Sequence, residues 1–290
     1  MRKAYFYLIV AAALWGSSIP VVKLGLLHGY DSLGFLWARL SMAALLSLFF
    51  LKPSTARSLL SQKRVWFWGL CNAGGFIFQF LGQREAPANQ AAVLLNTSVI
   101  FVALLSALFL KERLRWPALL GIALAFGGMV LVEGGGRGRW AFHPADIFLV
   151  MAPLLWSVFI LISKGLSQKW SQVSLLVPLN MVTFLFVAPI FPWSHFPREP
   201  LFYLLSLYMA LFCTVIPYWF YFQGLRRVTP TVASLLNSAQ IFFSILFGCF
   251  FLSERLTVPF FVGLAAVFGG IVLVESTRSG REGKQEDSRV

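Results

Sequence analysis

The chain has 290 residues, of which 58% are hydrophobic and only 12% are charged, and its mean hydropathy is +0.77. Soluble domains are about one quarter charged, so this composition excludes a water-soluble globule and indicates a protein embedded in a bilayer. The net charge of +13 does not indicate a nucleic-acid partner, because most basic residues fall where a membrane protein places its cytoplasmic loops.

Ten apolar stretches bounded by charge, Gly or Pro are long enough for membrane-spanning helices of about 20 residues each. In chain order they cover residues 4 to 24, 32 to 51, 65 to 83, 87 to 110, 116 to 132, 145 to 163, 172 to 191, 201 to 223, 229 to 252 and 257 to 274. The sequence therefore predicts an all-α integral membrane protein with ten transmembrane helices. Residues 276–290 have no apolar periodicity, and we expect a disordered tail there.

The distribution of Lys and Arg predicts the orientation in the membrane. With the N-terminus inside, most of the 24 basic residues lie in the connections on that same side. Few lie on the other side: Lys23, Arg84, Arg137, Arg139, Arg198 and Arg255. Cytoplasmic loops carry an excess of Lys and Arg, so we expect an integral protein of the plasma membrane with both termini cytoplasmic.

An internal repeat relates the two halves of the chain. Residues 110–114 (LKERL), followed by Pro117, recur in the second half as residues 252–256 (LSERL), followed by Pro259. Trp15 recurs as Trp156 in nearly the same register. A repeat unit of five spans is an odd number, so the second unit enters the membrane inverted. The predicted units are residues 1–138 and 139–275, followed by the tail, 276–290.

The first span also has the pattern of a cleavable signal peptide, because Arg2 and Lys3 precede an apolar run that ends in small residues. This span is the repeat partner of the sixth, however, and its removal would leave the first unit incomplete. We therefore expect the first span to remain in the protein.

Several short motifs together resemble a known family, the EamA-type carriers of the drug/metabolite transporter superfamily. These are residues 13–18 (ALWGSS), the Glu-Arg-Leu hairpins at 112–114 and 254–256, the Gly-Gly pairs of spans five and ten, and Arg39 in span two. The resemblance covers residues 1 to about 275. It implies two tandem five-helix units with a cavity between them, and export or facilitated transport of amino acids and other small metabolites. Asn180 replaces Arg39 in the second half, so the role of Arg39 is not duplicated.

Spans five and ten have small residues at a spacing of four, Ala123 with Gly127 and Ala265 with Gly269. Small residues at this spacing let membrane helices approach closely, so we expect both spans to serve packing. The Glu-Arg-Leu hairpins lie at helix junctions and are interpreted as structural turns rather than catalytic pairs.

Polar side chains inside spans cost free energy unless they face a partner or water, so they indicate a polar cavity. They concentrate in spans one, three, four, six, eight and nine, and span two adds Arg39. Two aromatic residues, Trp15 and Trp156, lie at matched places in spans one and six, and Trp219 belongs to an aromatic cluster in span eight. With the polar residues these give nine candidate substrate-binding residues: Trp15, Ser18, Arg39, Gln79, Asn96, Trp156, Trp219, Asn237 and Gln240.

Two roles remain open for the most informative candidates. Arg39 is the one cation within a span, and it either binds an anionic group such as a carboxylate or makes a buried structural pairing. Trp15 and Trp156 either anchor helix ends at the membrane interface or lie on opposite sides of a central site.

These features predict a secondary transporter of small metabolites, amino acids or related compounds, that works by alternating access. The alternatives are a non-transporting receptor or binding protein and an intramembrane enzyme, although no HExxH or GxSxG motif occurs. We expect no catalytic residue, metal site or cofactor. The expected partners are a small-molecule substrate and the lipid bilayer, and a monomer is sufficient to enclose a path. Coupling stays open, because no carboxylate lies clearly at the middle of a span.

Overall fold

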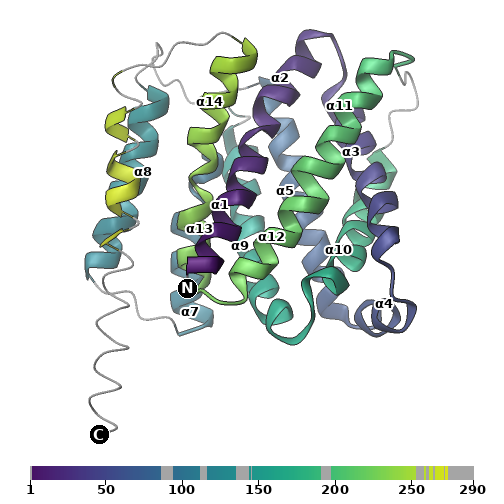
Figure 1. Cartoon of the computed structure of the whole chain (residues 1–290), viewed down its shortest axis with the longest axis horizontal. Coiled ribbons are helices and arrows are strands. Elements are labelled where there is room, and N and C mark those ends of the chain that lie inside the picture. The colour runs from purple at the N-terminus through teal and green to yellow at the C-terminus, as the bar shows by residue number, and fades with distance from the viewer. Residues whose placement is uncertain are drawn as a thin grey trace, which may run out of the picture.

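The chain folds into a bundle of helices, as the computed structural model shows (Figure 1). The structure describes residues 2–85, 94–111, 116–134, 144, 146–190, 197–252, 258, 261–263, 265–270 and 272–273, and these residues form no strand. The predicted tail and both Glu-Arg-Leu hairpins lie outside the described residues.

The first half of the chain supplies eight described elements. They are α1 (Arg2–Gly16), α2 (Ser18–Leu27), α3 (Ser32–Ser47), the 3-10 turn η1 (Leu48–Phe50), α4 (Pro53–Leu60), α5 (Lys63–Glu85), α7 (Ser98–Phe109) and α8 (Trp116–Gly134). The second half supplies α9 (Asp146–Lys169), α10 (Gln172–Val187), the 3-10 turn η2 (Ala188–Ile190), α11 (Pro200–Ala210), the π-helix η3 (Leu211–Val215), α12 (Ile216–Leu225), α13 (Pro230–Asn237) and α14 (Gln240–Leu252). Short helical pieces follow between residues 258 and 273.

Six described helical segments are long and apolar enough to cross a membrane. They are Arg2–Leu27, Ser32–Phe50, Asp146–Lys169, Gln172–Ile190, Pro200–Leu225 and Pro230–Gly248. Shorter apolar helices occupy Leu94–Phe109, Trp116–Gly128 and Phe261–Gly270. Many large apolar side chains face outward, including Phe49, Leu108 and Trp116. An outer surface of this kind suits lipid, because hydrocarbon does not penalise apolar exposure as water does.

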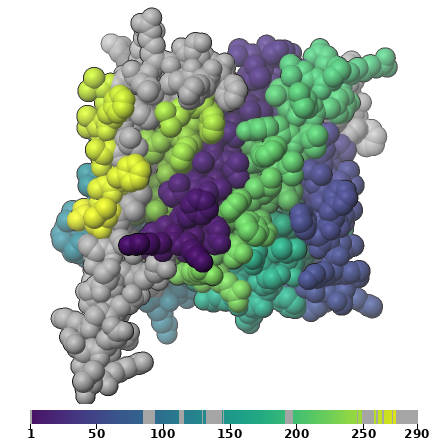
Figure 2. Space-filling model, in the orientation of Figure 1, coloured from purple at the N-terminus to yellow at the C-terminus, as the bar shows by residue number. Residues whose placement is uncertain are grey.

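Helix packing follows the sequence repeat. Helix α1 of the first half packs on α12 of the second half, and the equivalent pair is α9 of the second half on α5 of the first half. Likewise, α3 packs on α11, and the equivalent pair is α10 on α5. Helix α7 packs on α9, and the equivalent pair is α14 on α1. Figure 2 shows α1 on one surface of the molecule, between α14 and the α11 to α12 segment. The two halves are therefore interleaved rather than side by side.

Two glycines make equivalent close contacts between the halves. A Cβ atom at Gly82 would lie 2.5 Å from Cγ of Leu149, and one at Gly224 would lie 2.5 Å from Cγ of Leu8. Gly224 is the repeat partner of Gly82, and Leu149 is the repeat partner of Leu8. Both positions need Gly because the partner helix leaves no space for a side chain.

The helix of residues 116–134, α8, packs against the segment 258–273 at the edge of the bundle (Figure 1), but through residues other than those predicted. A Cβ at Gly128 would lie 2.7 Å from the carbonyl oxygen of Gly263, whereas one at Gly127 would meet nothing within 4 Å. Ala123 and Gly127 are exposed instead. The prediction of close packing holds, but the spacing-of-four pattern selected the neighbouring, outward face of the helix.

We call one end of the bundle the basic face, because it carries the excess of Lys and Arg residues. It carries the start of α1, the short helix α4 and the turn after α12, which lie together at the lower edge of Figure 1. At the opposite end, the hydroxyl of Tyr30 donates a 2.6 Å hydrogen bond to the carboxylate of Glu199 and thereby joins the two halves. This hydrogen bond raises the pKa of Tyr30 to about 12.

Candidate substrate-binding site

A cavity lies among the helices of both halves, and its volume is about 120 Å³. A single water needs roughly 10 to 15 Å³ by the same measure, so the space suits a molecule the size of a small metabolite. It is lined by Trp15, Ser18, Ile19, Arg39, Asn72, Phe76, Gln79, Leu95, Asn96, Ser98, Trp156, Phe159, Ile160, Tyr218, Tyr221, Asn237 and Gln240. These residues come from spans one, two, three, four, six, eight and nine, as the distribution of polar residues predicts.

Three of these spans are interrupted next to the cavity. The break between α1 and α2 is at Ser17, the break before α7 is at Thr97, and α13 and α14 are separated by Ser238 and Ala239. The hydroxyl of each of these three breaking residues donates to a carbonyl three residues earlier. Irregular backbone at membrane depth is tolerated where it lines a cavity, and these breaks place polar side chains there.

Arg39 is 3% exposed and is held by groups of span eight. Its Nη2 donates to the carbonyl oxygen of Cys213 at 2.7 Å, and its Nε donates to Oγ1 of Thr214 at 2.9 Å. In an α-helix the Cys213 carbonyl would accept from the residue four positions later, which is Pro217 and has no N–H. Cys213 lies in the π-helix η3, and Arg39 supplies its carbonyl with a donor that Pro217 cannot provide.

The same guanidinium also borders the cavity. Its carbon atom lies 4.8 Å from the centroid of the Phe76 ring, over the aromatic face. Arginine has five N–H donors, and the two contacts with span eight use two of them. Arg39 can therefore make the structural pairing and still bind an anion. Its remaining N–H donors are available, and its positively charged guanidinium forms part of the cavity wall. Asn180, its repeat partner, does not line the cavity.

The two repeated tryptophans make matching contacts across the halves. Trp15 meets Tyr218 edge-on, with ring centroids 5.6 Å apart and planes at 77°. Trp156 meets Phe76 in the same way, at 5.6 Å and 80°. Tyr218 is the repeat partner of Phe76, so the two pairs are equivalent under the repeat. Each tryptophan thus borders the cavity against an aromatic residue of the other half.

Amide side chains connect the cavity walls. The hydroxyl of Tyr218 donates to Oδ1 of Asn72 at 2.8 Å, and Nδ2 of Asn72 donates to the hydroxyl of Thr183 at 3.0 Å. Nε2 of Gln240 lies 3.3 Å from Oδ1 of Asn96. Oδ1 of Asn237 is buried at the cavity and has no hydrogen-bond partner among the described residues. It is therefore an acceptor that a ligand could use.

Eight of the nine predicted residues line this cavity, and Trp219 does not. Trp219 lies on another face of α12, with its ring centroid 4.9 Å from Phe220 and 6.3 Å from Tyr7. One helix position separates it from Tyr218, which does line the cavity, and residues adjacent in a helix point about 100° apart. Span eight therefore contributes Tyr218 and Tyr221 to the cavity wall, whereas the predicted Trp219 lies outside it.

The site also contains residues that the nine candidates omit. Asn72, Tyr218 and Tyr221 are polar or aromatic residues of the spans already implicated, and Phe76 and Phe159 are apolar. Phe76 could have been found from the repeat, because it corresponds to Tyr218. Phe159 could have been found in the same way, because it corresponds to the candidate Ser18.

Comparison with known proteins identifies the family. The model of the EamA-like transporter family matches residues 2–134 and again residues 143–276. The chain belongs to the EamA-like transporter family. It is therefore an integral membrane protein of a transporter family, which agrees with the membrane-span segments described above.

Three relatives are distant but match along nearly the whole chain. The "Uncharacterized transporter YetK" of Bacillus subtilis (strain 168) is 27% identical, over 92% of this chain and 85% of the relative. The "Probable terminal-alkyne amino-acid exporter" of Streptantibioticus cattleyicolor is 25% identical, over 97% and 96%. The "Probable amino-acid metabolite efflux pump" of Escherichia coli (strain K12) is 24% identical, over 94% of both chains.

One crystal structure superposes with a TM-score of 0.79 and covers 94% of this chain and 96% of its own. Its sequence identity is 19%, so it shows the fold alone. The relatives and the family model agree that the EamA-like fold extends over the two halves that surround the cavity.

Proposed function

We propose that this EamA-like protein is a secondary transporter that moves amino acids or related small metabolites across the plasma membrane by alternating access. The observation that carries the proposal is the cavity between two repeat-related halves, which combines aromatic walls, amide groups and one buried cation. Carriers built from inverted repeats bind their substrate at such an interface, next to interrupted helices.

The proposal includes a topology of ten spans, arranged as two inverted five-helix units. Every one of the ten apolar stretches contains described helical residues. The basic face is the cytoplasmic side, because it carries the excess of Lys and Arg, and both termini lie on that side. A monomer is sufficient, since one chain encloses the cavity.

The cavity chemistry supports a zwitterionic substrate. The free donors of Arg39 suit a carboxylate, and Oδ1 of Asn237 suits an ammonium or other N–H group. Trp15, Trp156 and Tyr218 offer aromatic faces to an apolar side chain or to a cation. Two relatives are named for amino-acid or amino-acid metabolite export, which supports the same substrate class.

Uptake into proteoliposomes tests the proposal. The purified protein is reconstituted and offered a panel of labelled amino acids, their decarboxylated amines and their deaminated acids. We expect saturable uptake of at least one amino acid, with weaker uptake of the amine and the acid, because each lacks one of the two charged groups. Uptake of no compound above that of empty liposomes would contradict the proposed function.

A further inference from the structure

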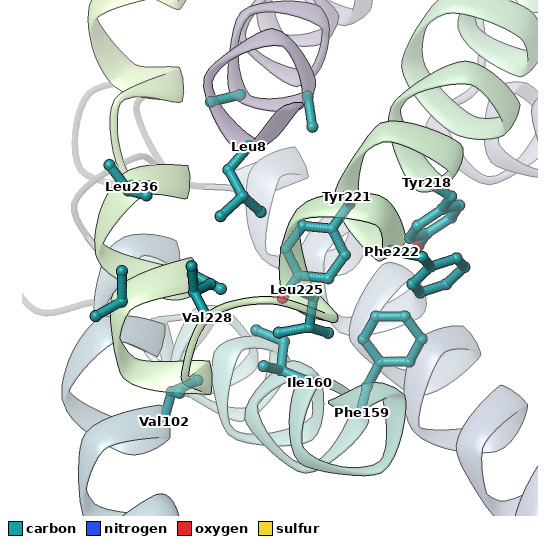
Figure 3. Packing of buried hydrophobic residues seen from close by; sticks show 14 of the residues in the cluster. Leu8, Val102, Phe159, Ile160, Tyr218, Tyr221, Phe222, Leu225, Val228 and Leu236 are labelled. Atoms are coloured by element: carbon teal, nitrogen blue, oxygen red, sulfur yellow. The ribbon is translucent and has the colours of Figure 1, made fainter. Parts of the chain in front are cut away.

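An apolar cluster closes the cavity toward the basic face. Figure 3 shows this cluster, and we call six of its members the inner plug: Leu8, Val102, Ile160, Leu225, Val228 and Leu236. They are between 0% and 8% exposed, and they come from α1, α7, α9, α12, the turn after α12, and α13. Ile160 also lines the cavity, so the plug begins where the cavity ends.

The opposite side of the cavity is polar at some of the equivalent positions and apolar at others. The repeat pairs Leu225 with Gln83, and it pairs the cavity residues Tyr221 and Phe159 with Gln79 and Ser18. Gln79 and Ser18 line the cavity and are half-buried, whereas Tyr221 and Phe159 are buried. Within the plug itself, Leu8, Ile160 and Leu236 correspond to the apolar residues Leu149, Ile19 and Leu95. The two ends therefore differ at Leu225 and at the cavity residues next to it, and the basic side is the more apolar of the two at these positions.

Lys164 fixes the segment that carries two plug residues. Its Nζ donates to the carbonyl oxygens of Leu225 at 2.9 Å, Arg226 at 3.1 Å and Val228 at 2.8 Å. An ammonium has three donors, and here three of the last carbonyls around the end of α12 accept from it. A cation at a helix C-terminus is also favoured by the helix dipole. Lys164 therefore binds the turn after α12 to α9.

A polar group next to the plug has no hydrogen-bond partner in the part of the chain that the structure describes. Tyr221 is 1% exposed, and its hydroxyl has no hydrogen-bond partner among the described residues. In Figure 3 the ring extends from α12 toward Leu225. A buried hydroxyl without a partner costs free energy, which water would recover if the plug opened. The unsatisfied Tyr221 hydroxyl thus favours opening, while the Lys164 contacts favour closure.

We propose that Lys164 is the latch of a cytoplasmic gate, formed by the inner plug, and that release of its contacts with the turn after α12 opens the cavity to the cytoplasm. This inference rests on the proposed carrier function. Lys164 acts as a positioning residue, since it touches the turn and not the substrate. The described structure is then the state that is closed on the cytoplasmic side.

Sided thiol labelling tests the latch without any substrate. Val228 is 1% exposed, so a Val228→Cys variant reports opening of the plug to a membrane-impermeant maleimide from the cytoplasmic side, in inside-out vesicles. A Gln79→Cys variant reports access to the cavity from the other side, in right-side-out vesicles. The parent chain with its native cysteines, labelled in parallel, is the blank.

Each reporter is combined with Lys164→Met, with Lys164→Arg and with the matched control Lys169→Met, an exposed lysine of the same helix. We expect Lys164→Met to raise cytoplasmic labelling of Val228→Cys about tenfold, because three charge-assisted hydrogen bonds that favour the closed state are lost. Labelling of Gln79→Cys from outside should fall at the same time. Lys164→Arg, which keeps the charge and the donors, should restore both rates, and Lys169→Met should change neither.

Two results would overturn the latch. Unchanged labelling of Val228→Cys in Lys164→Met would show that these contacts do not hold the gate. Faster labelling of Val228→Cys with no fall at Gln79→Cys would show local fraying of the turn rather than a change of state. Absence of substrate flux in the parent chain, together with the expected labelling, would contradict the carrier function and leave the latch standing.

Discussion

Arg39 illustrates how one side chain can serve both fold and function. It donates to the Cys213 carbonyl, for which Pro217 offers no N–H, and it borders the cavity with the rest of its guanidinium. Its position within an apolar span indicated importance, but the sequence does not reveal which group it meets. The partner lies far away in the second half of the chain, and its need arises from a proline in another helix.

A double-mutant cycle tests the structural part of this role. Arg39→Met should lower the free energy of unfolding by about 1 to 3 kcal/mol, because it leaves a buried carbonyl without a donor. In a Pro217→Ala background the restored N–H of residue 217 replaces that donor, so the loss should be smaller. Thermal unfolding in detergent gives both values, and equal losses in the two backgrounds would contradict the explanation.

The tryptophans provide a matched test of the cavity. Trp156→Phe should raise the KM for substrate about tenfold, because a cavity wall loses aromatic area and an N–H. Trp219→Phe makes the same chemical change outside the cavity and should leave KM unchanged. Uptake kinetics in proteoliposomes measure both. If Trp219→Phe alone raised KM strongly, Trp219 would be a substrate-binding residue, as the sequence predicts, although it lies outside the cavity.

Among the elements, helices were predictable and interruptions were not. The apolar stretches coincide with described helices because a bilayer requires about 20 apolar residues per span. The breaks at Ser17, Thr97 and Ser238 and the π-helix η3 lie within apolar stretches long enough for one continuous helix, so the apolar pattern does not indicate them. Helix α4 was not predicted either, because its eight residues are too few and too polar to form an apolar stretch.

Packing of α8 at the edge of the bundle gives a prediction at this scale. Gly128→Ala should destabilise the protein by about 1 to 3 kcal/mol, because the new methyl group would collide with the backbone of Gly263. Gly127→Ala adds a methyl group where nothing lies within 4 Å and should be neutral or slightly stabilising. The unfolding temperatures of the two variants test this prediction. A larger decrease for Gly127→Ala than for Gly128→Ala would refute the assigned packing face.

For the whole molecule, the sequence repeat was the most informative signal, because it predicts both the cavity and the equivalence of its walls. The matched contacts of Trp15 and Trp156 show this equivalence in the structure. The repeat does not predict the difference between the two ends of the path, since that depends on the positions at which the halves diverge. Leu225 and Gln83 are one such pair.

The cavity composition predicts the coupling of the whole transport cycle. None of the described lining residues is Asp, Glu, His or Lys, so this part of the protein has no group suited to bind and release a proton near neutral pH. Initial uptake rates in proteoliposomes should therefore be the same with and without an imposed proton gradient. A rate that rises with the gradient and collapses with a protonophore would contradict this.

Counterflow is the measurement that tests the central claim most directly. Proteoliposomes are loaded with an excess of an unlabelled amino acid that is transported, then diluted into a trace of the labelled compound. A carrier that exposes one site alternately to the two sides exchanges the two pools, so the label should accumulate transiently above its external concentration. Saturable binding without any such overshoot would contradict alternating access and would indicate a binding protein instead.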